Sequence, residues 1–257
     1  LTIDADAGGS TAGALTLAGT ATGDVAVTGA ESTVTLADGF TGTGLVSVTT
    51  ADVATQTIAL GSGTTGTRTV DATAMTDGDM LTLTGSDALT LSSDDADVDA
   101  AAYTGAITAT VTGTAAAAYS LGTTSSSLAS SNSGGLSVNA EALADGQLLT
   151  LSGTGNVTVN NLLADLTSTS TGTVAVTLDD DAASGMNATI TNNASSGTLT
   201  VNSGEFDWVL AEITQQPGNA VVRSGNVDVV AEARLGVDAG HARLLVVDLP
   251  GVEVEDG

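Results

Sequence analysis

Short runs that alternate an aliphatic residue with Thr, Ser or Ala recur along this chain and are bounded by Gly, Asn or Asp. Examples are Val25-Ala26-Val27, Leu89-Thr90-Leu91 and Val174-Ala175-Val176. A two-residue period is typical of a β-strand that buries one face, and Thr favours an extended backbone while its hydroxyl faces water. The alanine run 115–118 is too short to hold a helix by itself. The pattern therefore predicts an all-β fold.

A long internal repeat organises these strands. The segment 70–85 (VDATAMTDGDMLTLTG) returns as 138–153 (VNAEALADGQLLTLSG). Looser copies begin near Ile3 and Val201. The period is about 68 residues, and periods of this length indicate stacked or tandem units. We therefore expect a β-repeat region over 1–204, with repeats at about 1–67, 68–135 and 136–204, and a C-terminal cap or assembly segment over 205–257.

The composition favours a thin core. The chain has two Phe, one Trp, two Tyr and no Cys in 257 residues. Sandwich cores usually contain large aromatic side chains, whereas a solenoid needs only small aliphatic ones between stacked coils. We expect a right-handed parallel β-solenoid (β-helix) of ~67-residue repeats, each with about three coils of three short strands, and a distinct C-terminal β segment. Tandem small β-sandwiches are the alternative.

An Asp or Asn stands near the start of each unit, after a Val or Ile, at Asp4, Asp71, Asn139 and Asn202. Such a residue can be a repeated metal ligand, or a turn residue whose side chain accepts hydrogen bonds from backbone amides at a corner. Because Asp and Asn interchange here, and a calcium ligand more often keeps its charge, we favour structural turn positions.

Acidic side chains dominate the charge, with 30 Asp and Glu against four Lys and Arg and a net charge of -26. Such a surface argues against nucleic acid as a partner. The chain also repels itself, so the fold should gain from cations or high salt that screen the carboxylates.

Two acidic runs are candidate calcium ligands because Ca²⁺ prefers several carboxylate oxygens in loops. They comprise Asp94, Asp95, Asp97 and Asp99, and the run Asp179, Asp180 and Asp181. Neither matches an EF-hand loop or the Gly-Gly-x-Gly-x-Asp nonapeptide of calcium β-rolls. Calcium is the one candidate cofactor, and no organic cofactor is indicated.

The repeated Val-Asp/Asn-Ala, Leu-Thr-Leu-x-Gly and Val-Thr-Val strings, the dominance of Ala, Thr, Gly, Ser and Asp, and the lack of Cys and Lys carry a family resemblance. Residues 1–204 resemble the repeat regions of bacterial surface-layer proteins and of RTX-like adhesins exported by type I secretion. The resemblance implies a calcium-responsive repeat that folds outside the cell and forms a lattice, filament or stalk.

Localisation and partners follow from the same features. We expect an extracellular or cell-surface protein that assembles with copies of itself and binds cell-surface polysaccharide. No apolar run reaches the roughly 18 residues of a membrane-spanning helix. Because the chain begins at Leu1 rather than Met, we expect a processed product or part of a longer protein.

The segment from 205 onwards differs in composition and holds the only Trp and both prolines. Phe206 and Trp208 are one residue apart and would share one face of a strand. They are candidate assembly anchors for a neighbouring subunit. The alternative is an aromatic plug that covers the last coil of the solenoid and protects its edge.

Two further function classes deserve comparison with a structural or adhesive role. A polysaccharide-acting β-helix enzyme would need aromatic platforms and a positioned acid or base, and the repeat region offers only Phe40, Tyr103, Tyr119 and Arg68. We therefore predict no enzymatic activity. An ice- or surface-binding solenoid would need ranks of Thr on one flat face. Thr-x-Thr pairs do recur, but their spacing along the chain is irregular.

Overall fold

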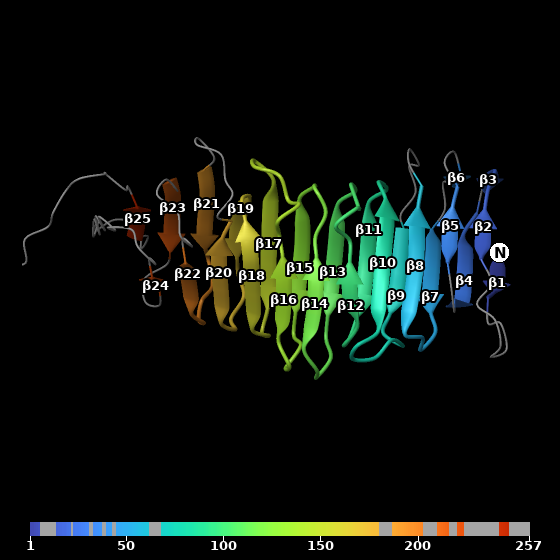
Figure 1. Ribbon diagram of the computed structural model, residues 1–257, viewed down its shortest axis with the longest axis horizontal. Coiled ribbons are helices and arrows are strands. Elements are labelled where there is room, and N and C mark those ends of the chain that lie inside the picture. The colour runs from blue at the N-terminus through green and yellow to red at the C-terminus, as the bar shows by residue number, and fades with distance from the viewer. Residues whose placement is uncertain are drawn as a thin grey trace, which may run out of the picture.

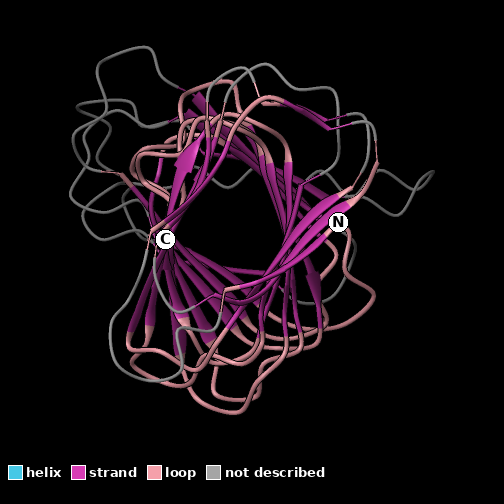
Figure 2. Cartoon of the chain, turned by 90° about the vertical axis from the view of Figure 1, so that its right-hand side faces the viewer, coloured by secondary structure: helices cyan, strands magenta, loops and turns pink. Residues whose placement is uncertain are grey.

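Two strands and the corners between them form one coil of the chain, and successive coils stack in parallel register. The computed structural model describes residues 1–5, 14–21, 23–30, 33–37, 40–42, 45–61, 68–179, 187–202, 210–215, 220–223 and 242–246. Figure 1 shows the stack from the side, and Figure 2 shows along its axis that two sheets face each other around one interior. The predicted parallel β-solenoid is therefore confirmed, and the described strands do not form tandem sandwiches.

The strands alternate between the two sheets. Sheet A contains β1 (Thr2–Asp4), β4 (Val25–Ala30), β7 (Val46–Thr50), β9 (Arg68–Ala72), β11 (Leu89–Ser93), β13 (Ile107–Val111), β15 (Ser126–Ser130), β17 (Leu148–Gly153), β19 (Asp165–Ser168), β21 (Asn187–Asn192), β23 (Leu210–Gln215) and β25 (Ala242–Val246). Sheet B contains β2 (Leu15–Leu17), β5 (Val34–Leu36), β8 (Thr55–Leu60), β10 (Met80–Gly85), β12 (Asp97–Asp99), β14 (Ala117–Ser120), β16 (Leu136–Asn139), β18 (Val157–Leu162), β20 (Val174–Leu178), β22 (Leu199–Asn202) and β24 (Ala220–Arg223). A third pair joins β3 (Thr20–Ala21) to β6 (Thr41–Gly42).

The core lies between the two sheets because every strand turns alternate side chains inward. Val27, Ile58, Leu83, Val138 and Ile190 are all fully buried, and they belong to one continuous apolar cluster along the stack. Burying an aliphatic side chain of this size contributes about 1.5–3 kcal/mol. Since each coil supplies only a few such residues, stability depends on stacking many coils.

The structural repeat is one coil of about 21 residues rather than a 67-residue module. The length of a coil varies, because Leu81 pairs with Val98 across a short coil, whereas Ile58 pairs with Leu83 across a longer one. Each coil has two main strands, where the sequence led us to expect three. Corners of different length absorb most of the variation in coil length, and the register shifts only within β4 and β18 among the described strands.

The long internal repeat corresponds to three and a half coils, so it exchanges the two sheets. The first copy starts in β9 of sheet A and continues into β10 of sheet B, whereas the second starts in β16 of sheet B and continues into β17 of sheet A. β10 and β17 nevertheless have the same alternation of buried and partly exposed residues. One sequence segment therefore fits either sheet.

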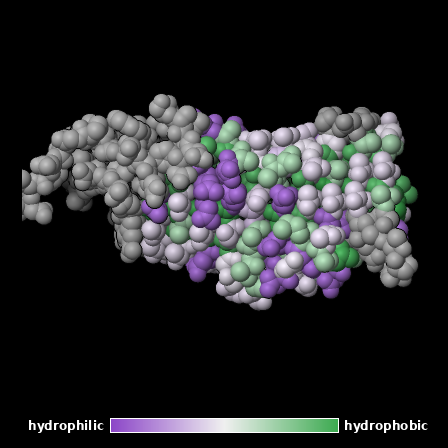
Figure 3. Space-filling model, viewed as in Figure 1, coloured by the Kyte–Doolittle hydropathy of each residue, from purple (hydrophilic) through white to green (hydrophobic). Residues whose placement is uncertain are grey.

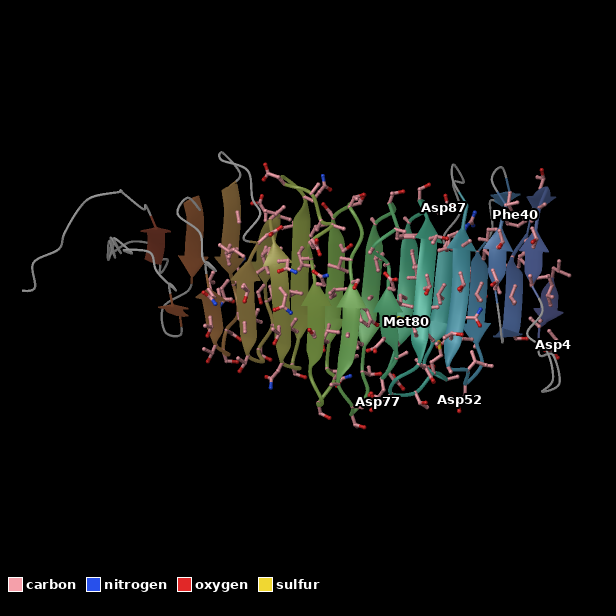
Figure 4. All side chains as sticks on the ribbon, in the orientation of Figure 1. Asp4, Phe40, Asp52, Asp77, Met80 and Asp87 are labelled. Carbon is pink, nitrogen blue, oxygen red and sulfur yellow. The ribbon has the colours of Figure 1, made fainter. Side chains whose placement is uncertain are left out.

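Two edges of the solenoid follow from this winding. At the A-to-B edge the chain passes from sheet A to sheet B, as in 73–79, and at the B-to-A edge it returns, as in 86–88. Figure 4 shows Asp52 and Asp77 along the first edge and Phe40 and Asp87 along the second.

Strands from the segment predicted to be distinct continue the stack. β23 pairs in parallel with β21, and β24 pairs in parallel with β22. β25 then pairs antiparallel with β23. Both sheets thus extend past residue 205, and the single reversal of strand direction among the described strands comes only at β25.

Candidate interaction surfaces

One outward column of sheet A carries a small side chain, nearly always with a hydroxyl group, in consecutive strands. The chain spacing between its members varies from coil to coil, yet backbone pairing aligns them. The members, in order, are Thr2, Ala26, Ser47, Thr69, Thr90, Thr108, Ser127, Thr150, Thr167 and Thr191.

A second outward column runs beside the first, two residues further along each strand. It includes the registered partners Thr49, Asp71, Ser92, Thr110, Ala129 and Ser152. Neighbours are about 4.8 Å apart between strands and about 6.7 Å apart along a strand. Apart from Asp71, the two columns therefore form a regular array of hydroxyl and methyl groups.

Sheet B carries a shorter version of this pattern. One of its outward rows passes from Thr57 and Thr82 to Asp99, and then to Ser120 and Asn139. Charged and amide side chains interrupt the hydroxyl groups in this row. The neighbouring row is uncharged over five described strands, at Ala118, Ser137, Thr158, Ala175 and Thr200. On the face drawn in Figure 3, strongly hydrophilic residues gather in patches separated by surface of intermediate hydropathy.

The first acidic run lies on and beside β12, where its carboxylates bind the backbone of the chain. Asp95 Oδ1 accepts hydrogen bonds from the amides of Thr114 at 2.7 Å and Ala115 at 2.8 Å, one coil further on. Asp97 Oδ1 accepts the amide of Ala118 at 2.8 Å. These two side chains therefore join adjacent coils.

The other two members of this run have similar roles. Asp94 accepts the hydroxyl of Thr112 in the next coil. Asp99 Oδ1 accepts the amide of Ala101 at 3.1 Å, which closes a local turn. Among the described residues, no three acidic or histidine side chains are grouped so that they could hold a metal ion.

The second acidic run is described only at its first member. Asp179 follows β20 and is buried, with 7% of its surface exposed. Its amide donates to the carbonyl oxygen of Leu162 at 3.2 Å. Asp180 and Asp181 lie outside the described residues.

The predicted turn positions lie at the last or the penultimate residue of a strand. Asp71 Oδ1 accepts the amide of Thr73 at 3.1 Å, and Asn139 Oδ1 accepts the amide of Glu141 at 3.2 Å. Asp4 and Asn202 are the last residues of β1 and β22. Phe206 and Trp208, the candidate assembly anchors, lie outside the described residues.

Sequence reasoning missed a further copy of this corner. Val98-Asp99-Ala100 matches the Val-Asp/Asn-Ala string, and its Asp closes the same turn. The Ala of this string is Ala72, Ala100 or Ala140. Three residues after it, a large side chain fills the interior, and the backbone amide of that residue donates to the carbonyl oxygen of the Ala. These side chains are Met75, Tyr103 and Leu143.

A buried polar group also escaped the sequence reasoning. Arg68 is fully buried, and its Nε lies 3.1 Å from Oδ2 of Asp87. Its guanidinium lies 5.9 Å from the ring centre of Phe40. The hydroxyl of Tyr103 donates to the backbone carbonyl of Asp87. Burial, followed by the nearby charge of Asp87, raises the pKa of Tyr103 well above its usual value.

The aromatic residues considered as sugar platforms are inside the solenoid. Phe40, Tyr103 and Tyr119 are 5%, 0% and 2% exposed. Burial raises the pKa of Tyr119 to about 12. These rings therefore pack in the core and offer no open face on which a sugar could stack.

Within the described part of the chain, no helix has the length and apolarity needed to cross a bilayer. The chain matches no model of a known protein family, and comparison with curated proteins and solved structures found no similar protein.

Proposed function

We propose that this chain is an extracellular structural or adhesive repeat of a cell surface, acting as a stalk, filament or lattice component that associates with copies of itself. The observation that carries the proposal is the unbroken parallel pairing of both sheets through successive coils. Such a stack sets a fixed distance between its ends and presents long, repetitive faces, which is how solenoids commonly serve as scaffolds.

The acidic residues support the same role. Asp95, Asp97 and Asp165 each accept a backbone amide from the next coil, which strengthens the contact between coils. The net charge of -26 opposes close approach of two copies unless cations are present. Divalent cations such as Ca²⁺ would reduce this repulsion and favour assembly.

We also propose that the chain has no enzymatic activity. A site for sugar hydrolysis would combine a pair of carboxyl groups with a surface that holds the sugar. The aromatic side chains of the described region are buried, and the carboxylates of Asp95 and Asp97 are engaged by backbone amides. We therefore favour a structural role over catalysis.

The test is thermal unfolding by circular dichroism, with particle size followed by light scattering and electron microscopy, in chelator, in millimolar Ca²⁺ and in molar NaCl. Ordered assembly in Ca²⁺ or in salt is the expected result. Particles that stay monomeric in all three conditions would contradict self-assembly. Stability and assembly that respond to Ca²⁺ alone would indicate specific cation sites.

A second candidate function is binding to a regular hydroxylated surface, such as ice or crystalline polysaccharide. The array on sheet A favours it, because Thr and Ser from coils of unequal length align into straight columns. Methyl and hydroxyl groups at fixed spacings can order water or match a periodic lattice. Apart from Asp71, the named members of the two columns carry no charge, which suits a neutral partner.

A matched pair of variants separates this function from a purely structural one. Thr150 lies in the first column of sheet A, between Ser127 and Thr167. Thr82 occupies the equivalent repeat position on sheet B, where its partner in the next coil is the charged Asp99. Both side chains are partly exposed. Thr150→Lys should reduce inhibition of ice recrystallisation or retention on crystalline cellulose or chitin, whereas Thr82→Lys should not. Equal effects of the two variants, or no binding by the unaltered chain, would refute it.

A further inference from the structure

The coils of this solenoid are so alike that many pairings look acceptable. Most inward positions of the described strands hold Val, Leu, Ile or Ala. If a strand paired one coil too far along, its alternation would still place aliphatic residues inside. The long internal repeat adds further near-matches. The fold therefore needs contacts that occur in only one register.

The buried group at the B-to-A edge supplies such contacts. Phe40 precedes β7, Arg68 begins β9, Asp87 precedes β11 and Tyr103 precedes β13, so the group spans consecutive coils of sheet A. Figure 4 shows Phe40 and Asp87 along this edge. The side chains of Arg68 and Asp87 are 0% and 3% exposed, which makes their pairing a desolvated one.

The guanidinium of Arg68 has a buried carboxylate beside it in only one register. In the observed pairing Arg68 lies opposite Leu89, two residues after Asp87. If β9 paired with β13 instead, the residue equivalent to Asp87 would be Gly105. Among the described residues, the other buried acid is Asp179, many coils away. A one-coil slip would therefore leave a buried guanidinium without a carboxylate, which is strongly unfavourable.

The second copy of the repeat shows that this corner does not need charge to form. The positions equivalent to Arg68 and Asp87 are Leu136 and Gly155. Leu136 begins β16 and pairs with Val157, just as Arg68 begins β9 and pairs with Leu89. An uncharged pair thus supports the same backbone arrangement. Buried ion pairs commonly add little stability, and their best-attested use is to specify register.

We propose that the Arg68–Asp87 pair, held by Phe40 and Tyr103, selects the register in which the coils stack. This role also affects the hydroxyl columns, because a slipped coil would break the alignment of Thr69, Thr90 and Thr108.

The test uses cysteine pairs as reporters of register, since the chain has no Cys of its own. Thr69 and Thr90 are direct partners, so their Cα atoms are close enough for a disulfide. Thr69 and Thr108 are two strands apart, about 9.6 Å, which is too far. Thr69→Cys with Thr90→Cys therefore reports the native register, and Thr69→Cys with Thr108→Cys reports a one-coil slip.

The informative background is the double variant Arg68→Leu/Asp87→Gly, which copies the second repeat. After refolding and oxidation, this background should still fold. The yield of the slipped disulfide in the Thr69→Cys/Thr108→Cys chain, relative to the yield of the native disulfide in the Thr69→Cys/Thr90→Cys chain, should rise roughly a hundredfold. Leu83→Ala, which removes a fully buried side chain of β10, is the control for lost stability. It should give the native disulfide alone.

Three outcomes would overturn the proposal. The first is a double variant that forms only the native disulfide. The second is a Leu83→Ala control that forms the slipped disulfide equally well. The third is a double variant that does not fold, since the pair would then be needed for stability rather than for choosing between registers.

Discussion

Gly85 should be among the least replaceable residues of this chain. Its φ of +117° lies in a region that residues with a side chain rarely adopt, and a Cβ at this position would overlap the carbonyl oxygen of Leu60 in the coil below. Its own carbonyl accepts the amide of Thr104 at 2.8 Å from the coil above. Gly85 therefore allows three successive coils to approach closely at one corner.

Two costs add up in Gly85→Ala. The backbone conformation costs about 1–3 kcal/mol, and moving β10 away from Leu60 costs about 1–3 kcal/mol more. The sum of about 4 kcal/mol corresponds to a fall in Tm of roughly 8–16 °C for a chain of this size. Thermal unfolding followed by circular dichroism measures this fall directly.

Two further glycines separate the contributions. Gly78 has a φ of +86° but nothing within 4 Å of an added Cβ, so Gly78→Ala should cost only the conformational part. Gly23 has open space and no such conformation, so Gly23→Ala should leave the Tm almost unchanged. If Gly85→Ala were no worse than Gly78→Ala, close packing between coils would not explain the requirement for glycine.

Other predictions test the corners and the core. Asp95→Ala removes the acceptor of two amides and should lower stability by about 1–2 kcal/mol in chemical denaturation, whereas Ala at the exposed Asp52 should change it little. Tyr119 has a pKa of about 12 in the folded chain against a usual value of 10.0. The stability that its protonated hydroxyl contributes is therefore complete below pH 10 and is lost between pH 10 and 12. Tyrosinate absorbance should therefore rise together with unfolding in alkali, and a normal titration in the folded chain would refute burial of the hydroxyl.

The sequence was sufficient to predict strands and a solenoid because alternation and thin aliphatic composition are local properties. It could not distinguish three coils per repeat from three and a half. Both sheets bury the same alternation, and the Asp-Gly turns at Gly78 and Gly146, each with positive φ, fit either edge. β10, which contains Leu83, and β17, which contains the equivalent Leu151, thus have the same burial pattern although they lie in different sheets.

The hydroxyl columns and the buried pair were hidden for a related reason. The step along the chain from Thr90 to Thr108 is shorter than the step from Ser127 to Thr150, so chain distance conceals their alignment. Comparing the central outward residue of each predicted strand would have revealed the column. Arg68 offered no such signal, because its burial depends on Asp87 in the next coil.

The internal repeat spans three and a half coils, so that its two copies lie on opposite sheets, which is the central claim about this fold. The most direct test is a distance measurement between spin labels attached to cysteines. Thr90 and Thr150 belong to one column of sheet A, three strands apart, so their Cα atoms should be about 14 Å apart. Thr158 lies on sheet B, three and a half coils from Thr90, at about 20 Å, and labels there should point away from the label at Thr90. A longer distance for Thr90→Cys/Thr158→Cys than for Thr90→Cys/Thr150→Cys is the predicted result. Equal or shorter distances would place both copies of the repeat on one face and contradict the two-strand coil.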